Sequence, residues 1–311
     1  MNHWQETRRT LSVWALVRLL ILTAALAPSI WASDAGNSFK TDMLVSTEWL
    51  ADHLRDSNLI VLCIVDDERF YLAGHIPGAR MIRLAQIVTT REAIPNELPS
   101  PSNLQHVFEA AGLSNNSHII LYGERSGILA ARAYFTLDYL GLADRAALLD
   151  GGVEKWRAER REDSTAVPAV RVTKLGIRPR PEILVSLAQM TEYSRSAKGD
   201  AVLMDARPPS EYAGEKLSED VSKAGHIPNA VGLYWRNFLR DDSSTELKPA
   251  NELEALFHAS GVTAGKEVVS YCRTGMQSSF SYFVAKYLGY RTRMYDGSFY
   301  EWSRSSPPVQ H

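Results

Sequence analysis

The sequence predicts an α/β fold built from two copies of one domain, and three observations lead to this prediction. Short apolar runs rich in β-branched residues alternate with amphipathic helical stretches, which is typical of a mostly parallel sheet with helices on both faces. Several segments of the first half of the chain recur in the second half in the same order. The length of 311 residues gives each copy the size of an ordinary domain.

Each element follows from its periodicity. Residues 59–65 form an apolar β-rich run, and a helical stripe of Leu104, Val107, Phe108 and Ala111 comes later in the first copy. The second copy repeats this order with a strand at 201–204 and a helical stripe of Leu253, Leu256 and Phe257. A third β-rich run at 266–271 is followed by apolar residues at helical spacing, which end at Gly289.

The internal repeat is visible as matched segments. The pairs are 74–79 with 225–230, 107–112 with 256–261, 134–141 with 282–289, and 150–156 with 296–302. A repeat of this length indicates two domains rather than a solenoid of small units.

A cysteine lies in a predicted strand-to-helix loop at 272–277. Backbone N–H groups converge at such a helix start, and the positive end of the helix dipole favours an anion there. Arg273 adds a positive charge beside Cys272, and Gly275 lets the backbone turn inward. These features favour a reactive thiolate. The alternative is an inert buried cysteine, which usually lacks a flanking arginine.

The segment 268–279 resembles the active-site loop of the rhodanese family, sulfurtransferases that carry sulfur as a cysteine persulfide. Residues 203–207, 211–212 and 225–230 resemble the first strand and following loop of these domains, and 295–302 resembles their closing motif. The resemblance implies two tandem rhodanese-like domains. The expected organisation is an N-terminal domain at 43–160, a linker at 161–180 and a catalytic domain at 181–305. Gly123 matches Cys272 in the first copy, so we expect that domain to be non-catalytic.

The resemblance implies a double displacement without a cofactor. The Cys272 thiolate takes the outer sulfur of thiosulfate or 3-mercaptopyruvate, and cyanide or a thiol then removes it from the persulfide. The expected binding residues are Arg273, Thr274, Gly275, Met276 and Gln277, whose N–H groups face the anion. Arg273 is expected to hold the oxyanion end of the donor.

Other residues are expected to support this site. Arg207 or Arg236 is a candidate for a further positive charge that binds the donor, and Asp205 is expected to accept a backbone hydrogen bond near the Cys272 loop. His226 is expected to be structural, because the first copy keeps the equivalent His75 without a cysteine. Trp156 and Trp302 are expected to be core aromatics that anchor helices.

The choice of donor and the function class stay open from the sequence. Arg273 favours thiosulfate, whereas Thr274 and Glu211 stand where animal thiosulfate enzymes carry basic residues, so 3-mercaptopyruvate remains an alternative. A persulfide carrier with slow turnover, or a binding protein with a vestigial site, is a further alternative. A related phosphatase is disfavoured, because Gln277 and Ser278 stand where an arginine would bind phosphate.

The amino-acid composition limits the classes of molecule that we expect the protein to bind. A net charge of −2, with 23% charged residues, gives no sign of a nucleic-acid partner. Two cysteines exclude a disulfide framework, and Cys63 is expected to be a buried strand residue. Neither cysteine has neighbours at metal-ligand spacing, so no metal is expected. We expect a monomer whose partners are the small sulfur donor and acceptor.

The N-terminus has the layout of a secretory signal peptide at 1–32. Arginines precede an apolar run at 19–27, and small residues follow around Ala32. The apolar run is short for a membrane span. We therefore expect periplasmic export by the general secretory or the twin-arginine route, followed by cleavage and no stable membrane association. An uncleaved anchor is the alternative.

Overall fold

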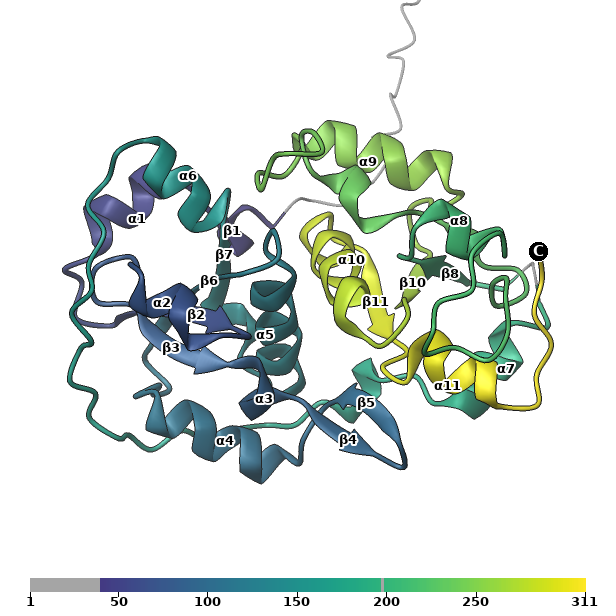
Figure 1. Cartoon of the computed structure of the whole chain (residues 1–311), viewed down its shortest axis with the longest axis horizontal. Helices are drawn as coiled ribbons and strands as arrows, with labels where there is room; N and C mark the ends of the chain where they lie inside the picture. The colour runs from purple at the N-terminus through teal and green to yellow at the C-terminus, as the bar shows by residue number, and fades with distance from the viewer. Residues whose placement is uncertain (1–39, 197–198) are drawn as a thin grey trace, which may run out of the picture. The chain divides into compact units, whose positions relative to one another are not determined.

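The computed structural model describes residues 40–196 and 199–311, which form two α/β domains in tandem (Figure 1). The predicted signal peptide lies outside the described residues. Within the described part of the chain, no helix has the length and apolar character needed to cross a bilayer.

The first domain contains a parallel sheet of five strands in the order β1-β7-β6-β2-β3. The strands are β1 (Leu44–Val45), β2 (Leu59–Val65), β3 (Arg80–Arg83), β6 (His118–Gly123) and β7 (Ala146–Leu149). The helices are α1 (Thr47–His53), α2 (Glu68–Leu72), α3 (Leu84–Ile87), α4 (Pro101–Ala110), α5 (Ile128–Tyr139) and α6 (Gly152–Ala158), with short 3-10 turns at Thr41–Met43 and Ala143–Arg145.

The second domain repeats this plan with a parallel sheet in the order β11-β10-β8-β9. The strands are β8 (Ala201–Asp205), β9 (Val231–Gly232), β10 (Glu267–Tyr271) and β11 (Arg291–Met294). The helices are α7 (Leu187–Tyr193), α8 (Pro209–Tyr212), α9 (Ala250–Ala259), α10 (Met276–Tyr287) and α11 (Ser298–Arg304), with 3-10 turns at Pro181–Ile183 and Trp235–Phe238. A parallel bridge from Leu184 to Met294 takes the place that β1 has in the first sheet.

Both sheets are buried on two faces, which confirms the predicted architecture. In β2, Leu62 and Ile64 pack into the core that contains α4 and α5. The alternate residues Val61, Cys63 and Val65 pack into a second core with residues of α1 and α6. Strands buried on both sides are continuous hydrophobic runs, which is why 59–65 lacks a polar alternation.

Helices α5 and α10 join the two domains through one hydrophobic core. Tyr134 and Phe135 of α5 meet Phe283 and Tyr282 of α10 edge to face, each pair with ring centroids 5.0 Å apart. The buried Asp138 carboxylate of α5 accepts hydrogen bonds from Tyr282 Oη and Lys286 Nζ of α10. The interface therefore combines aromatic packing with a buried polar contact.

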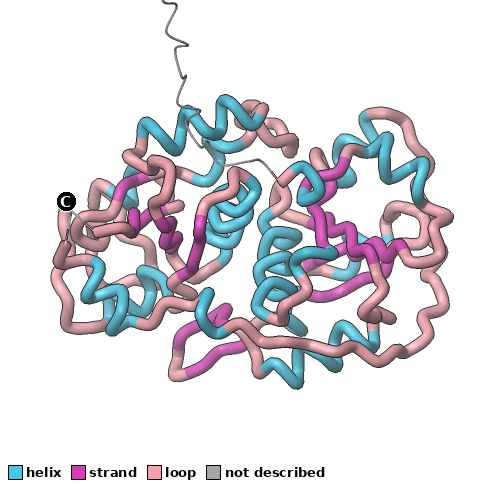
Figure 2. The backbone as a smooth tube through the Cα atoms, turned by 180° about the vertical axis from the view of Figure 1, so that it is seen from behind, coloured by secondary structure: helices cyan, strands magenta, loops and turns pink. Residues whose placement is uncertain are grey.

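An antiparallel hairpin extends from the first domain toward the second. It consists of β4 (Thr89–Arg91) and β5 (Ile94–Glu97), and Figures 1 and 2 show it projecting beside α11. The N–H of Leu98, which follows β5, donates to Asp296 Oδ2 of the second domain at 3.1 Å.

Residues 161–180 contain no helix or strand and run along the first domain. The N–H groups of Arg178 and Arg180 donate to the carbonyl oxygens of Leu140 and Tyr139 at the end of α5. Ser164 forms an isolated bridge with His75.

Candidate active site

Cys272 directly follows β10 and precedes α10, as the apolar patterns on both sides predict. The loop is shorter than expected: it spans 272–275, and Met276 and Gln277 already belong to the first turn of α10. Gly275 caps the helix with a positive φ of 81°. A Cβ on Gly275 would lie 2.6 Å from Asp296 Oδ1, so both the backbone conformation and the space require glycine.

The Cys272 thiol is shielded from bulk solvent, since the residue is only 1% exposed. Its Sγ accepts a hydrogen bond from Ser278 Oγ of α10 at 3.5 Å. The carbonyl oxygens of Cys272 and Arg273 accept hydrogen bonds from the N–H groups of Phe299 and Tyr300 in the first turn of α11. The loop is therefore held between two helix starts.

Ser298 ties the two ends of the loop together. Its Oγ accepts from the N–H groups of Cys272 and Gly275, at 3.2 and 3.1 Å, and donates to the carbonyl oxygen of Tyr295. Sequence reasoning missed both Ser298 and Ser278 as members of the site. The available signal for Ser298 was that the first copy has Gly152 at the matching position.

Four amide N–H groups around the loop have no hydrogen-bond acceptor among the described residues. They belong to Arg273, Thr274, Met276 and Gln277. The first N–H groups of an α-helix lack intrahelical partners, and together with the helix dipole they favour an anion in front of the helix. The fifth expected donor, Gly275, is already used by Ser298.

The side chains of Arg273 and Thr274 differ in what they contact. Arg273 is 43% exposed, with its Nε 3.6 Å from Asp220 Oδ2, a distance beyond a normal hydrogen bond. Thr274 Oγ1 accepts a hydrogen bond from Asn96 Nδ2 of the hairpin at 3.1 Å. The hairpin of the first domain thus reaches the cysteine loop of the second.

Arg207 is paired with Asp205. Its guanidinium is buried, and its Nε and Nη2 donate to the Asp205 carboxylate, with Nη2 also donating to the Gly225 carbonyl oxygen. Burial disfavours the charge, but attraction to Asp205 raises the pKa of Arg207 overall. These contacts give Arg207 a structural role beside the expected binding of the donor, which stays a prediction.

Asp205 lies beside the Cys272 loop, because it pairs in register with Tyr271 across β8 and β10. Its Oδ1 accepts a hydrogen bond from the N–H of Arg207 at 3.0 Å. Its carboxylate contributes to raising the pKa of Tyr271, after the larger effect of burial. The Asp205–Arg207 pair thus supports the strand end that precedes Cys272.

His226 has a structural environment. Its Nδ1 lies 2.8 Å from the Tyr212 carbonyl oxygen, and its ring stacks on Tyr212 with centroids 3.9 Å apart. The first copy repeats this arrangement with His75 on Tyr71. Burial lowers the pKa of His226.

Two further residues named from the sequence have defined surroundings. Arg236 lies over the Trp235 ring at 5.2 Å, and its Nη2 donates to the Asp242 carbonyl oxygen. Glu211 is buried, and its Oε2 has no hydrogen-bond donor among the described residues. No hydrogen bond or salt bridge links Arg236 to the Cys272 loop in the described part of the chain.

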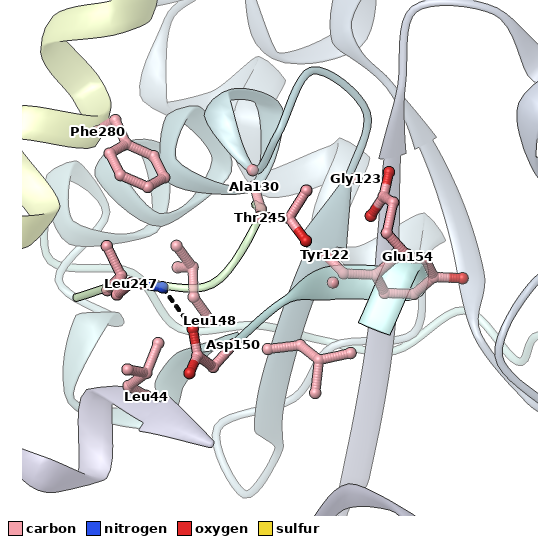
Figure 3. Close-up of a pocket in the computed structure, with 13 residues that line it drawn as sticks. Leu44, Tyr122, Gly123, Ala130, Leu148, Asp150, Glu154, Thr245, Leu247 and Phe280 are labelled. Atoms are coloured by element: carbon pink, nitrogen blue, oxygen red, sulfur yellow. Dashed lines mark hydrogen bonds between the residues drawn. The ribbon is translucent and has the colours of Figure 1, made fainter. Parts of the chain in front are cut away.

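The matching position of the first domain cannot accommodate a cysteine. Ile76 N donates to Tyr122 Oη as Ile227 N donates to Tyr271 Oη, so Gly123 corresponds to Cys272. A Cβ on Gly123 would overlap the Ile64 carbonyl oxygen. Figure 3 shows the small pocket beside Gly123, lined by Tyr122 and Glu154 and bordered by the hydrogen bond from Leu247 N to Asp150.

The first-domain loop also carries a carboxylate, Glu124, at the position that matches Arg273 of the second. Glu124 Oε2 accepts from the N–H groups of Asp66 and Asp67, at 2.5 and 3.3 Å. This loop runs from 123 to 127 before α5 begins and is one residue longer than its counterpart. No cluster of three or more metal-ligating side chains occurs among the residues that the structure describes.

Comparison with known proteins agrees with this geometry. Two segments, 46–159 and 191–305, match the rhodanese-like domain family. The chain is 34% identical over 271 residues to the sulfur carrier protein TtuD of Thermus thermophilus, covering 84% of this chain and 93% of that protein. It is 31% identical over 270 residues to a thiosulfate sulfurtransferase of Pseudomonas aeruginosa, covering 86% and 97%.

Solved structures show the same fold. The wild-type structure of EanB aligns with a TM-score of 0.75 at 25% identity, over 86% of this chain and 69% of that one. An anaerobic ergothioneine biosynthesis enzyme from Chlorobium limicola, bound to trimethyl histidine, aligns with a TM-score of 0.74 at 25% identity, over 85% and 68%. The chain belongs to the rhodanese-like domain family, and it contains that domain twice.

Proposed function

We propose that the protein is a thiosulfate sulfurtransferase that works through a persulfide on Cys272. One observation carries the proposal: Cys272 begins the short loop that leads into α10, and four backbone N–H groups of this loop and of the first turn of α10 have no acceptor in the described part of the chain. Such donors stabilise the negative charge of a thiolate and of a persulfide.

The proposed reaction balances without a redox cofactor. The Cys272 thiolate attacks the outer sulfur of thiosulfate, the S–S bond breaks, and sulfite leaves with the electron pair. Cyanide or a thiolate then attacks the terminal sulfur of the persulfide, and the cleaved bond returns its electrons to Cys272. Arg273, half exposed at the loop, is the proposed partner for the sulfonate oxygens.

The test is thiocyanate formation from cyanide by the purified protein, with thiosulfate or 3-mercaptopyruvate as the donor. We expect turnover with thiosulfate and none with Cys272→Ser, and mass spectrometry should find one extra sulfur atom on the peptide that contains Cys272. A better rate with 3-mercaptopyruvate would reassign the donor. Activity that survives in Cys272→Ser would refute the persulfide on this residue.

A carrier role is the second candidate, because one relative is a sulfur carrier protein. A carrier would load one sulfur atom from the donor and release it to a protein thiol faster than to cyanide. Single-turnover release to the two kinds of acceptor distinguishes the roles.

We also propose that the chain is exported to the periplasm and acts there as a monomer. The arginines and the apolar run before Ala32 support export. Expression of the full chain in a bacterium, followed by fractionation and N-terminal sequencing, tests this. A mature N-terminus near Ala32 in the periplasmic fraction is expected, and a full-length chain in the cytoplasmic fraction would contradict it.

A further inference from the structure

A buried arginine of the first domain contacts the cysteine loop of the second. Arg132, in the first half of α5, is 0% exposed. Its Nη1 donates to Asp296 Oδ1 at 2.6 Å, and its Nη2 donates to Asp296 Oδ2 at 3.1 Å. Nη2 also donates to the Asn96 carbonyl oxygen at 2.5 Å, and Nη1 reaches the Gly275 carbonyl oxygen at 3.4 Å.

The bond to Gly275 bears on the proposed anion site. In a trans peptide the carbonyl oxygen of one residue and the N–H of the next point in opposite directions. Arg132 lies on the carbonyl side of the Gly275–Met276 peptide. It therefore favours the peptide orientation in which the Met276 N–H points away from the Arg132 guanidinium. That N–H is one of the four without an acceptor in the described chain. The bond from Arg132 is weak at 3.4 Å, and Ser279 Oγ donates to the same carbonyl oxygen at 2.7 Å, so Arg132 acts on the loop mainly through Asp296.

Asp296 links Arg132 to the rest of the loop. The Oδ1 atom of Asp296 limits the space at Gly275. Asp296 also lies two residues before Ser298, whose Oγ accepts hydrogen bonds from the N–H groups of Cys272 and Gly275. A bidentate arginine–carboxylate pair fixes both partners in position as well as in charge. Holding Asp296 thus holds the segment that ties the loop ends together.

The hairpin gives a second support from the same domain. Asn96, whose carbonyl oxygen binds Arg132, also donates from Nδ2 to Thr274 Oγ1 at 3.1 Å. The N–H of Leu98 donates to Asp296 Oδ2. Contacts from the first domain therefore reach Thr274, Gly275 and Asp296.

We propose that Arg132 is a positioning residue for the Cys272 loop, through which the non-catalytic domain takes part in sulfur transfer. The inference rests on the proposed function, because it assigns Arg132 to the same persulfide site. Arg132 touches no reacting atom. It holds the donors of the anion site in place before the reaction begins.

The test compares Arg132→Met and Arg132→Lys with Lys286→Met. Lys286 is a matched control: it is a largely buried cation in the same α5–α10 interface, and it binds Asp138 rather than the loop. It lies ten residues beyond the start of α10, about 15 Å along the helix. Each variant is mixed with saturating thiosulfate, and the Cys272 persulfide is followed by mass spectrometry in a single turnover.

A loss of orientation lowers the rate constant, whereas partial unfolding lowers the amplitude. For Arg132→Met we expect full amplitude with a rate constant lower by roughly 10- to 100-fold, as is typical of misplaced catalytic groups. Arg132→Lys should recover part of this loss, and Lys286→Met should load at the wild-type rate constant. A wild-type rate constant in Arg132→Met, or an equal slowing in Lys286→Met, would overturn the proposal.

A donor-independent readout separates this inference from the proposed function. If the wild type forms no persulfide, the proposed function fails. The rate of Cys272 alkylation by iodoacetamide, followed on the Cys272 peptide, then compares the same variants. Slower alkylation in Arg132→Met but not in Lys286→Met supports positioning by Arg132, and equal rates refute it.

Discussion

Ser298 shows how one residue separates the two copies of the domain. Ser298 has a φ of 54°, and the matching Gly152 has a φ of 57°. Glycine adopts this conformation easily, whereas serine is strained in it by about 1 kcal/mol or more. The copy that contains Cys272 therefore keeps a strained residue, and its hydroxyl accepts hydrogen bonds from two N–H groups of the cysteine loop.

Ser298→Gly is expected to lower activity, with a smaller loss of stability than its three lost hydrogen bonds alone would cause. Those bonds are worth about 1 kcal/mol each, and glycine relieves about 1 kcal/mol of backbone strain, so we expect a net loss of roughly 2 kcal/mol. The loop loses the link between its ends, so the persulfide loading rate should fall roughly 10-fold. Loading reactions quenched at successive times measure the rate of persulfide formation, and thermal unfolding measures the stability. A variant with a wild-type loading rate would show that Ser298 is only structural.

The Asp205–Arg207 pair leads to the opposite prediction. Arg207→Met leaves the buried Asp205 carboxylate without its cation, which typically costs 3–5 kcal/mol. We expect a clear drop in the free energy of unfolding in urea. In the fraction that stays folded, the thiosulfate concentration for half-maximal loading should be unchanged.

Arg273→Met provides the comparison for Arg207→Met. The Arg273 side chain is half exposed, as is its partner Asp220, so its removal leaves no buried carboxylate without a cation. Arg273→Met should raise the half-maximal thiosulfate concentration and leave stability nearly unchanged. If Arg207→Met instead raised that concentration without loss of stability, Arg207 would bind the donor after all.

The sequence predicts best those parts of the site that depend on local structure. The places of Cys272 and Gly275 follow from a strand, a helix start and a turn within a few positions, and periodicity reveals all three. Arg132 and Asn96 reach the loop from 143 and 178 residues away, which no local pattern encodes. The pairing of Arg207 with Asp205 was not predicted either, because the sequence does not reveal which way a long side chain points.

At the scale of elements, each domain sends a loop to the other, and the two contacts are equivalent but differ in charge. Leu98 N binds Asp296, and Leu247 N binds the matching Asp150. Beside Leu247, Glu246 forms a salt bridge with Lys155 of α6 at 2.7 Å. At the matching positions, Glu97 of β5 faces Glu301 of α11, so the lysine is replaced by a second carboxylate. Glu97 and Glu301 line one cleft of about 450 Å³, in which Glu97 pairs with Arg91 at 2.7 Å and Glu301 forms no salt bridge with any described residue.

The pKa shifts of this cleft predict a pH-dependent stability. Burial raises the pKa of Glu301, the neighbouring Tyr295 hydroxyl partly offsets this rise, and the Glu92 and Asp296 carboxylates add to it. A carboxyl whose pKa is raised by folding favours the protonated folded state, so stability is lost as the pH rises through the folded value. Glu301→Gln should therefore raise the melting temperature at pH 7 by about 2–4 °C.

The same substitution should have no effect near pH 4, where the native carboxyl is protonated. Glu252→Gln in α9 is the control, because Glu252 is exposed and lies on another helix. Thermal unfolding between pH 4 and pH 8 measures both variants against the wild type. A melting-temperature gain for Glu301→Gln that was constant across this range would contradict the assigned cause.

At the scale of the whole molecule, each domain contributes a side chain to the equivalent loop of the other domain, and the two side chains differ in kind. Helix α5 supplies the Arg132 guanidinium to the loop at Gly275. Helix α10 supplies the Phe280 ring to the loop at Gly127, where an added Cβ would lie 3.2 Å from it. The repeat in the sequence predicted two similar domains, but it did not predict that equivalent helix positions carry a cation in one copy and an aromatic ring in the other.

This asymmetry predicts that a cysteine alone does not create a second active site. Gly123→Cys in a Cys272→Ser background should take up no sulfur from thiosulfate. Its Cβ overlaps the Ile64 carbonyl oxygen, and Glu124 places a carboxylate in the same loop. The strain of inserting atoms into this packed position should cost about 1–3 kcal/mol of stability.

The control for this experiment is Gly199→Cys in the same background, since a Cβ there meets nothing closer than 3.9 Å. Mass spectrometry after incubation with thiosulfate measures sulfur on either cysteine, and thermal unfolding measures the strain. Persulfide on Gly123→Cys but not on Gly199→Cys would mean that the first domain retains a working anion site. The loss of activity in that copy would then be due to the missing thiol alone, and the contacts from Arg132 would not be what distinguishes the two loops.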